Sequence, residues 1–224
     1  MTAITPTKAS ERKVAQSPGS SEPVIALKRR TIDSVLISLG AVVAVVLVVA
    51  GVLLTWGSSF AADYVDDELS SQNIIFPEAA SLQEDGRADL LGYAGEAVNT
   101  GPEAEAYASY IDGHLAAVAD GATYAELGGP EREAKAAVEA AKAAGGDEAS
   151  IAQLQGEADA VTGQRNTLFK GETLRGLLLT AFAWSTVGRI AGIAAMAAFA
   201  AGAVMLVLVL LGMRHHHKIA VVGT

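Results

Sequence analysis

The sequence has no cysteine, few aromatic residues and fewer charges than a soluble protein of its length would carry. Without cysteine, disulfide bonds and thiolate metal sites are excluded, so packing must hold any folded region together. Aromatic residues make up 5% of the 224 residues and charged residues 18%, against roughly 25% charged residues in typical soluble domains. The low charge content results mainly from two long apolar runs, and these runs indicate the fold class.

The first run, residues 35–56, contains 22 residues and no charge. At about 1.5 Å per residue, a helix of this length matches a hydrocarbon core of about 30 Å. It also lacks the polar stripe that a helix of a soluble domain would need. A secretory signal peptide is the alternative, since Ser59, Phe60 and Ala61 resemble a cleavage site, but its apolar part would be only about 7–15 residues long. We therefore expect a first transmembrane helix at residues 31–56.

The second run, residues 174–213, is longer than one span requires and is interrupted by two arginines. We expect the second span at residues 190–213, which carry no charge, with Arg189 at the outer interface. Residues 176–188 would then continue the helix into the interface or the external domain. A rival placement at residues 174–196 would bury Arg189 at considerable cost and leave an apolar stretch in the cytoplasm.

The charges that flank the two runs predict that both ends of the chain lie in the cytoplasm. Cytoplasmic flanks of membrane proteins carry an excess of lysine and arginine. The connecting residues 57–174 instead contain 22 acidic and 6 basic residues. Two tryptophans fall near the expected outer boundary, as in an aromatic belt. The expected boundary residues are Lys28, Arg29, Arg30, Arg214 and Lys218 on the inside, and Trp56, Trp184 and Arg189 on the outside.

These boundaries divide the chain into two spans and three other parts. Residues 1–30 are polar, lack apolar periodicity and are expected to form a disordered cytoplasmic tail. Residues 57–189 are expected to form an acidic, helical extracytoplasmic domain that includes helical extensions of both spans. Residues 214–224 would be a short basic cytoplasmic tail. The predicted fold class is an all-α plasma-membrane protein with two transmembrane helices and a small helical domain inserted between them.

Within the external domain, the apolar periodicity predicts helices and no strand of any length. Apolar residues recur at helical spacing from Ala104 to Val118, and Thr100 is the expected N-cap of that helix. The other expected helical segments are an extension of the first span to about Asn73, residues 87–98, residues 131–144 after a break at Gly128-Gly129-Pro130, and a segment from Ser150 into the second span.

Small residues spaced four apart are the most informative feature of the second span. In lipid, helices associate through close backbone approach, because water exclusion does not drive them together. The pattern predicts a packing surface that serves assembly with other subunits, pairing of the chain's own two helices, or both at once. The residues of this predicted surface are Gly188, Gly192, Ala194, Ala198 and Gly202.

The sequence contains no motif that indicates catalysis, a cofactor or a metal. Neither a Gly-x-Ser-x-Gly motif nor a phosphate-binding or dinucleotide-binding loop occurs in a suitable context. We interpret His114, the one histidine of the external segment, as a helix-surface residue. The tract His215-His216-His217 could bind metal, but a basic cap on the second span is the preferred interpretation. We therefore expect no catalytic residue, cofactor, metal site or nucleic-acid partner.

Four blocks of the sequence are distinctive, namely IIFPEAAS (74–81), YAGEAVNTGPEAEAYASYIDGHL (93–115), TYAEL (123–127) and LFKGETLRGLLLTAFAWSTVGRIAGIAA (168–195). These blocks resemble a group of actinobacterial two-span membrane proteins. The resemblance covers roughly residues 70–213 and implies a plasma-membrane protein of uncharacterised role. Many members carry the label aromatic ring-opening dioxygenase, but such an enzyme needs an iron site of histidines and a carboxylate, which one external histidine cannot build.

Two spans, a helical external domain and the lack of chemical motifs together predict a non-catalytic protein. The first hypothesis is an accessory or scaffold subunit, or a self-associating envelope protein, that acts through its external helices. Its partners would be the lipid bilayer and either further copies of itself or a larger membrane complex. The alternatives are a sensor that signals through a cytoplasmic partner and an oligomeric pore subunit.

Overall fold

The described part of the chain is mostly helical. A computed structural model describes the backbone of residues 29–222 and the side chains of residues 31–215. Within that range there is no strand, and Ile75 and Ala97 form an isolated antiparallel bridge. The predicted all-α class is thereby confirmed. The elements are α1 (Arg29–Ser70), α2 (Ala79–Glu84), the 3₁₀ helix η1 (Ala88–Tyr93), α3 (Gly101–Val118), α4 (Gly128–Ala143) and α5 (Glu148–Val222).

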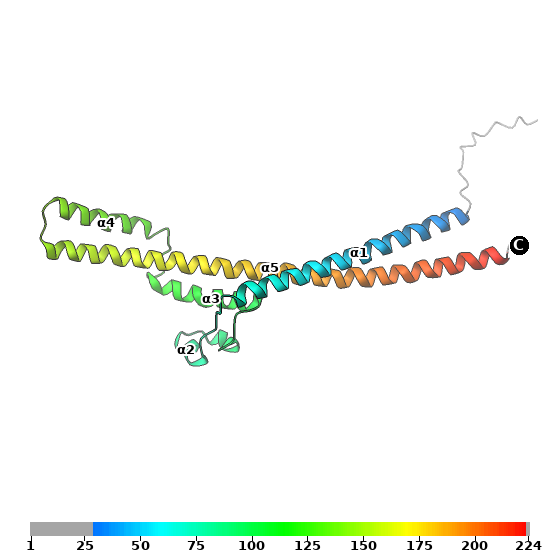
Figure 1. The fold of residues 1–224 in the computed structure, drawn as a ribbon, viewed down its shortest axis with the longest axis horizontal. Coiled ribbons are helices and arrows are strands. Elements are labelled where there is room, and N and C mark those ends of the chain that lie inside the picture. The colour runs from blue at the N-terminus through cyan, green and yellow to red at the C-terminus, as the bar shows by residue number, and fades with distance from the viewer. Residues whose placement is uncertain (1–28, 223–224) are drawn as a thin grey trace, which may run out of the picture.

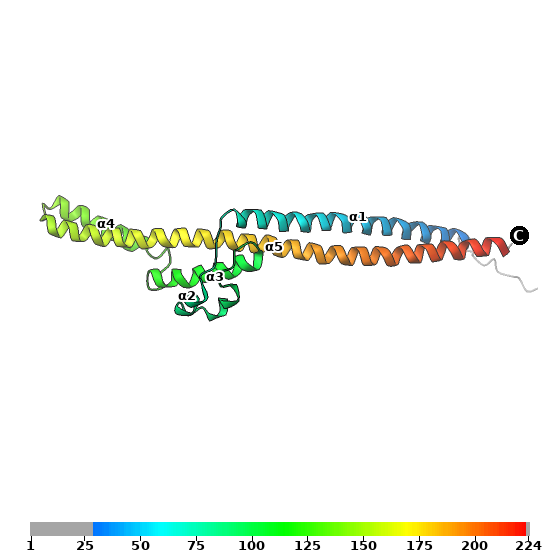
Figure 2. The same ribbon diagram turned by 60° about the horizontal axis from the view of Figure 1, so that its bottom comes forward.

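Helices α1 and α5 lie antiparallel along much of the molecule (Figures 1 and 2). They contain 42 and 75 residues, so they are about 63 and 112 Å long at about 1.5 Å per residue. Both are long and apolar enough to cross a membrane. Helix α5 continues well beyond the end of α1, and α3 and α4 pack against this extension. We call α3, α4 and residues 148–188 of α5 the arm.

Glycines report the register between the two long helices. A Cβ atom at Gly188 would lie 2.9 Å from the Cβ of Ala61, and one at Gly212 would lie 3.1 Å from Cγ1 of Ile37. Between them, the Gly51 position would meet the ring of Phe199. In each facing pair the two residue numbers add up to 249 or 250. Because this sum is constant, each residue in the paired part of α5 can be assigned the α1 residue that lies at the same height along the helix pair.

The segment after α1 differs from the prediction. Helix α1 ends at Ser70, because Asn73 adopts a positive φ of 50° and turns the chain. The predicted helix at residues 87–98 is wrong: only the 3₁₀ helix η1 forms there. Beyond it the chain is extended, and the Phe76 amide donates to the Glu96 carbonyl while the Val98 amide donates to the Ile74 carbonyl. This pairing buries Phe76 and Val98, which gain more from a shared core than from a helix.

Helix α3 forms as predicted, with Thr100 as its N-cap. The Thr100 side chain accepts from the Glu103 amide, and the Glu103 carboxylate accepts from the Thr100 amide, which completes a capping box. The apolar stripe of α3 turns inward, and Ala104 and Ala108 are almost fully buried. Phe76 stacks on Tyr93 and meets Tyr107 edge-on, with ring centroids 5.1 Å apart in both pairs. A small aromatic core thus joins the segment after α1 to α3.

The starts of α4 and α5 also differ from the prediction. Gly128, Gly129 and Pro130 do not break the chain but form the first turn of α4. A proline is tolerated there because first-turn amides have no partner within the helix. Helix α5 begins at Glu148, where the Asp147 carboxylate accepts from the amide and hydroxyl of Ser150. Its glycines do not interrupt it.

Candidate functional site

The paired helices present apolar side chains outward on all sides. Val35, Leu53 and Leu210 each leave 60–62% of their surface exposed. In each helix, only 11% of the 18 consecutive residues with the highest mean hydropathy are buried inside the protein. A soluble core helix would bury such side chains, so the exposed surface needs an apolar surrounding. We call residues 35–60 of α1 and residues 190–213 of α5 the apolar hairpin.

The small residues predicted to form a packing surface lie along the contact with α1. Gly188 is buried, and added Cβ atoms at Gly192 and Gly202 would lie 3.0 Å from Ser58 Oγ and 3.4 Å from Val48 Cγ2. Ala194 and Ala198 are half-buried. Gly188, Gly192 and Gly202 therefore pack closely against the chain's own α1, as one of the two interpretations expects. Gly51 was not predicted from the sequence, although it is a small residue within an apolar run.

The expected boundary residues are found at different places on the hairpin. Trp56, Trp184 and Arg189 are all exposed, the two tryptophans by 68% and 48% of their surfaces. Trp56 stacks on Phe60, and Phe60 stacks on Tyr64, so one face of α1 carries an aromatic ladder that leads away from the apolar hairpin.

The expected inner boundary residues belong to the other end of the hairpin. Arg214 is exposed near the end of α5. Lys28 and the tail before it lie outside the described residues. Arg29, Arg30 and Lys218 are helical, but their side chains lie outside the described range. The same holds for His216 and His217 of the histidine tract.

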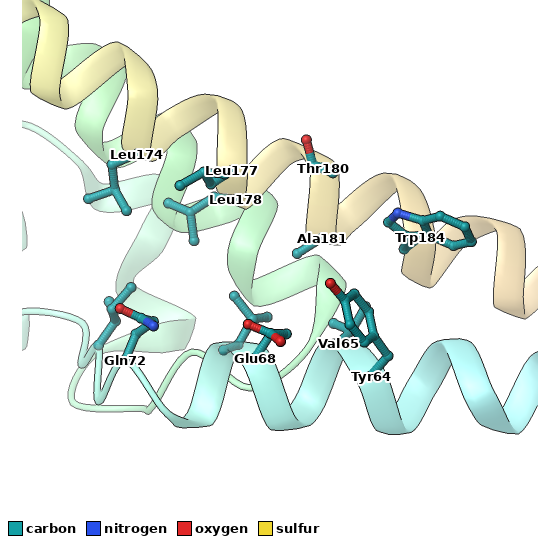
Figure 3. A pocket seen from close by; sticks show the side chains of 12 residues that line it. Tyr64, Val65, Glu68, Gln72, Leu174, Leu177, Leu178, Thr180, Ala181 and Trp184 are labelled. Atoms are coloured by element: carbon teal, nitrogen blue, oxygen red, sulfur yellow. The ribbon is translucent and has the colours of Figure 1, made fainter.

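A groove opens between α1 and α5 where the aromatic ladder ends (Figure 3). Its volume is about 260 Å³. The buried floor includes Val65 and Leu178, while Leu177 at the rim is 65% exposed. Glu68 and Gln72 of α1 supply its main polar groups (Figure 3). No local sequence pattern indicates this groove, because its two walls lie about a hundred residues apart in the chain.

A polar cluster attaches α4 to α5. The Glu131 carboxylate, 8% exposed, accepts from Lys135 Nζ at 2.7 Å and from Arg165 Nη1 at 2.6 Å. Thr162 donates to it as well, at 3.1 Å. The Arg165 guanidinium also lies 4.1 Å above the centre of the Tyr124 ring. These hydrogen bonds, first from Lys135 and then from Arg165, lower the pKa of Glu131 from 4.5 to about 2.

A second polar cluster holds the segment before α3 in place. Arg87 donates from Nη1 to the Ser109 carbonyl at 2.6 Å and from Nη2 to the Ser109 hydroxyl at 2.8 Å. The same guanidinium pairs with Asp89 at 2.8 Å. The Tyr110 hydroxyl donates to Asp85 at 3.0 Å. Both polar clusters therefore join elements to one another, and their groups are already paired within the protein.

His114 has neighbours of the kind expected for a helix surface. His114 Nδ1 lies 3.2 Å from the Tyr110 carbonyl, and its Nε2 lies 3.8 Å from the Asp85 carboxylate. Among the side chains that the structure describes, no three histidine, aspartate or glutamate groups come together as a metal site. Comparisons with protein-family models, curated proteins and solved structures found no match to this chain, so the actinobacterial resemblance stays a prediction.

Proposed function

We propose that the protein is a two-span membrane protein, with both ends in the cytoplasm, that acts without catalysis as an accessory or scaffold subunit through an extracytoplasmic arm. The observation that carries this proposal is the apolar hairpin, whose side chains face outward on both helices. The arm continues from it as a long helix whose surface is mostly polar and alanine-rich. Such an arm offers binding surface at a distance from the membrane.

The register of the hairpin supports placing the second span at residues 190–213. Residue 190 is level with about residue 60 of α1, and residue 213 is level with about residue 36. The charge-free part of α1, residues 35–56, therefore lies at the same depth to within about 6 Å, or four residues at about 1.5 Å each. Two charge-free segments aligned in depth form one apolar slab.

The same register argues against the rival span at residues 174–196. Residues 181–187 of α5 are level with the acidic end of α1. A bilayer that covered them would also cover four carboxylates, and each acidic residue at the centre of a span costs about 2.5–3.5 kcal/mol on insertion scales. The acidic residues concerned are Asp63, Asp66, Asp67 and Glu68.

Cysteine labelling would test the topology, since the native chain has no cysteine. Ala152→Cys, at an exposed position of the arm, should react with a membrane-impermeant maleimide on intact cells. Ser10→Cys, in the predicted cytoplasmic tail, should react only after the membrane is opened. Labelling of Ser10→Cys on intact cells would overturn the orientation.

Purification in mild detergent would test the accessory role. We expect a particle larger than the monomer, or a partner that co-purifies in constant proportion. A variant with charge reversals on the exposed face of α4, such as Glu133→Lys with Glu139→Lys, would show whether the arm carries the contact. A monodisperse monomer without any partner would contradict the proposal.

A sensor is the second candidate, favoured by the continuity of α5. One uninterrupted helix leads from the arm through the proposed second span. A tilt of the arm would therefore move the cytoplasmic end without any hinge. We propose that a cytoplasmic partner reads this movement through the N-terminal tail. Deleting residues 2–27 should abolish the cellular response to an external signal, and an unchanged response would remove this candidate.

A further inference from the structure

The groove between α1 and α5 lies just beyond the outer end of the apolar hairpin. By the register, Tyr64 is level with about residue 185, so Tyr64 and Trp184 mark its membrane-side end. Gln72 and Leu174 line its far end. The groove therefore stands along the membrane normal, with one end at the depth of the lipid headgroups.

The lining of the groove is suited to hydrocarbon. Val65, Leu69 and Leu178 are buried in its floor, and Ala181 and Leu177 extend the apolar surface to the rim (Figure 3). An apolar cavity of roughly 150 Å³ can stay dry and bind benzene. At about 260 Å³ the groove has room for a longer apolar chain. Leu177 is 65% exposed, so an occupant would remove apolar surface from water.

The aromatic ladder connects the groove to the apolar hairpin. Trp56, Phe60 and Tyr64 stack in sequence with ring centroids 5.8 and 6.3 Å apart. Trp56 and Phe60 are exposed, and so is Tyr64 at the groove itself. A chain that leaves the hydrocarbon along this face stays in contact with apolar surface throughout. Glu68 at the rim repels an anionic headgroup, which favours insertion by the tail.

We propose that this groove binds the hydrocarbon tail of a lipid from the outer leaflet of the membrane. The proposal rests on the two-span topology proposed above. It assigns the arm a contact with a single lipid molecule in addition to the surrounding bilayer. Arrival of the tail would fill the space between the two helices where α1 ends.

Tryptophan quenching tests the proposal, because the chain has two tryptophans at informative places. Trp56→Phe leaves Trp184 at the groove, and Trp184→Phe leaves Trp56 at the end of the hairpin. Both full-length proteins are reconstituted in vesicles of dioleoylphosphatidylcholine or of the same lipid with brominated chains. We expect brominated chains to quench Trp184 as well as Trp56, although Trp184 lies beyond the hydrocarbon.

Blocking the groove separates a bound tail from a misplaced bilayer. In the Trp56→Phe background, Ala181→Phe fills the groove and should restore the Trp184 emission seen in unbrominated vesicles. Leu177→Gln, at an exposed rim position that the fold does not need, should weaken the quenching as well. Leu179→Gln is the matched control, since Leu179 lies on the same helix but does not line the groove. It should leave the quenching unchanged.

The outcomes distinguish the two proposals. If Trp56 is quenched and Trp184 is not, the groove holds no lipid tail and this inference is wrong while the topology stands. If Trp184 is quenched equally with and without Ala181→Phe and Leu177→Gln, the residue lies in the bilayer itself and the inference is again overturned. If neither tryptophan is quenched, the proposed topology fails and the inference fails with it.

Discussion

At the scale of single residues, Glu131 shows how a chain without cysteine attaches one helix to another. Its carboxylate bridges Lys135 on its own helix and Arg165 on α5, which lies 34 positions later in the sequence. The alanines of α4 bury little apolar surface. The ion pair between Glu131 and Arg165, together with buried Val138, therefore positions this helix on α5. A polar contact here substitutes for a larger apolar interface.

Glu131 predicts a definite dependence of arm stability on pH. Its folded-state pKa of about 2 lies below the ordinary 4.5, so the stabilisation is complete above about pH 4.5 and is lost as the pH falls toward 2. The protection factors of the α4 amides, which correct hydrogen exchange for its intrinsic pH dependence, should therefore fall between these pH values and stay constant near neutrality.

Substitution isolates the contribution of Glu131. Glu131→Gln should raise the exchange rate of α4 at neutral pH and flatten its acid dependence. Glu139→Gln is the control, because Glu139 and Lys142 form an exposed pair within α4. It should change neither quantity, since exposed pairs contribute little. An unaltered acid profile in Glu131→Gln would refute the assignment.

Two glycines of α5 make opposite predictions. A methyl group at Gly171 would collide with the Leu115 side chain, which is buried in the contact between α3 and α5. Gly171→Ala should therefore destabilise the docking of α3, by about 1–3 kcal/mol as for overpacked cores. Gly176 meets nothing within 4 Å, so Gly176→Ala should stabilise the helix by up to about 1 kcal/mol.

Thermal unfolding of the two variants, followed by circular dichroism, measures this difference. The shifts should have opposite signs. Equal shifts in the same direction would mean that helix propensity, and not the contact with Leu115, determines the effect at position 171.

At the scale of elements, the sequence predicted best where the signals are local. The uninterrupted apolar run at residues 35–56 specifies a helix without reference to the rest of the chain. Thr100 and Glu103 specify the start of α3 through a capping box that spans four residues. The first helix was predicted because its apolar run is uninterrupted, and α3 was predicted because its cap and its apolar stripe are local.

The predictions failed where contacts between residues far apart in the sequence determine the structure. Residues 96–98 were expected in a helix, yet they pair with residues 74–76, a contact that no local pattern announces. The groove has the same origin, because it results from the register between α1 and α5. The rows of small residues indicated close packing, but they could not tell a partner helix in the same chain from one in another copy.

At the scale of the whole molecule, the length of α5 predicts how far the arm reaches. Position 152 lies 37 residues before Arg189, about 55 Å along a helix at about 1.5 Å per residue. Position 170 lies 18 residues closer to the membrane, about 27 Å by the same rule.

Fluorescence transfer to an acceptor dye in the lipid headgroups would measure this reach. Labels on Ala152→Cys and Lys170→Cys, both exposed positions, should differ in their height above the membrane by up to that 27 Å. Similar heights would show that the arm lies on the membrane surface and does not project from it.

The contacts of α3 and α4 with α5 also determine the order in which the helices can pack during synthesis. Helices α3 and α4 make their main contacts with α5, which a ribosome synthesises after both of them. At about 5–20 residues per second, the 75 residues of α5 take roughly 4–15 s to appear. During that interval α4 lacks its main partner, and α3 can pack only on the segment that follows α1. The docking of α4 and the main contacts of α3 therefore form only after α5 has been synthesised.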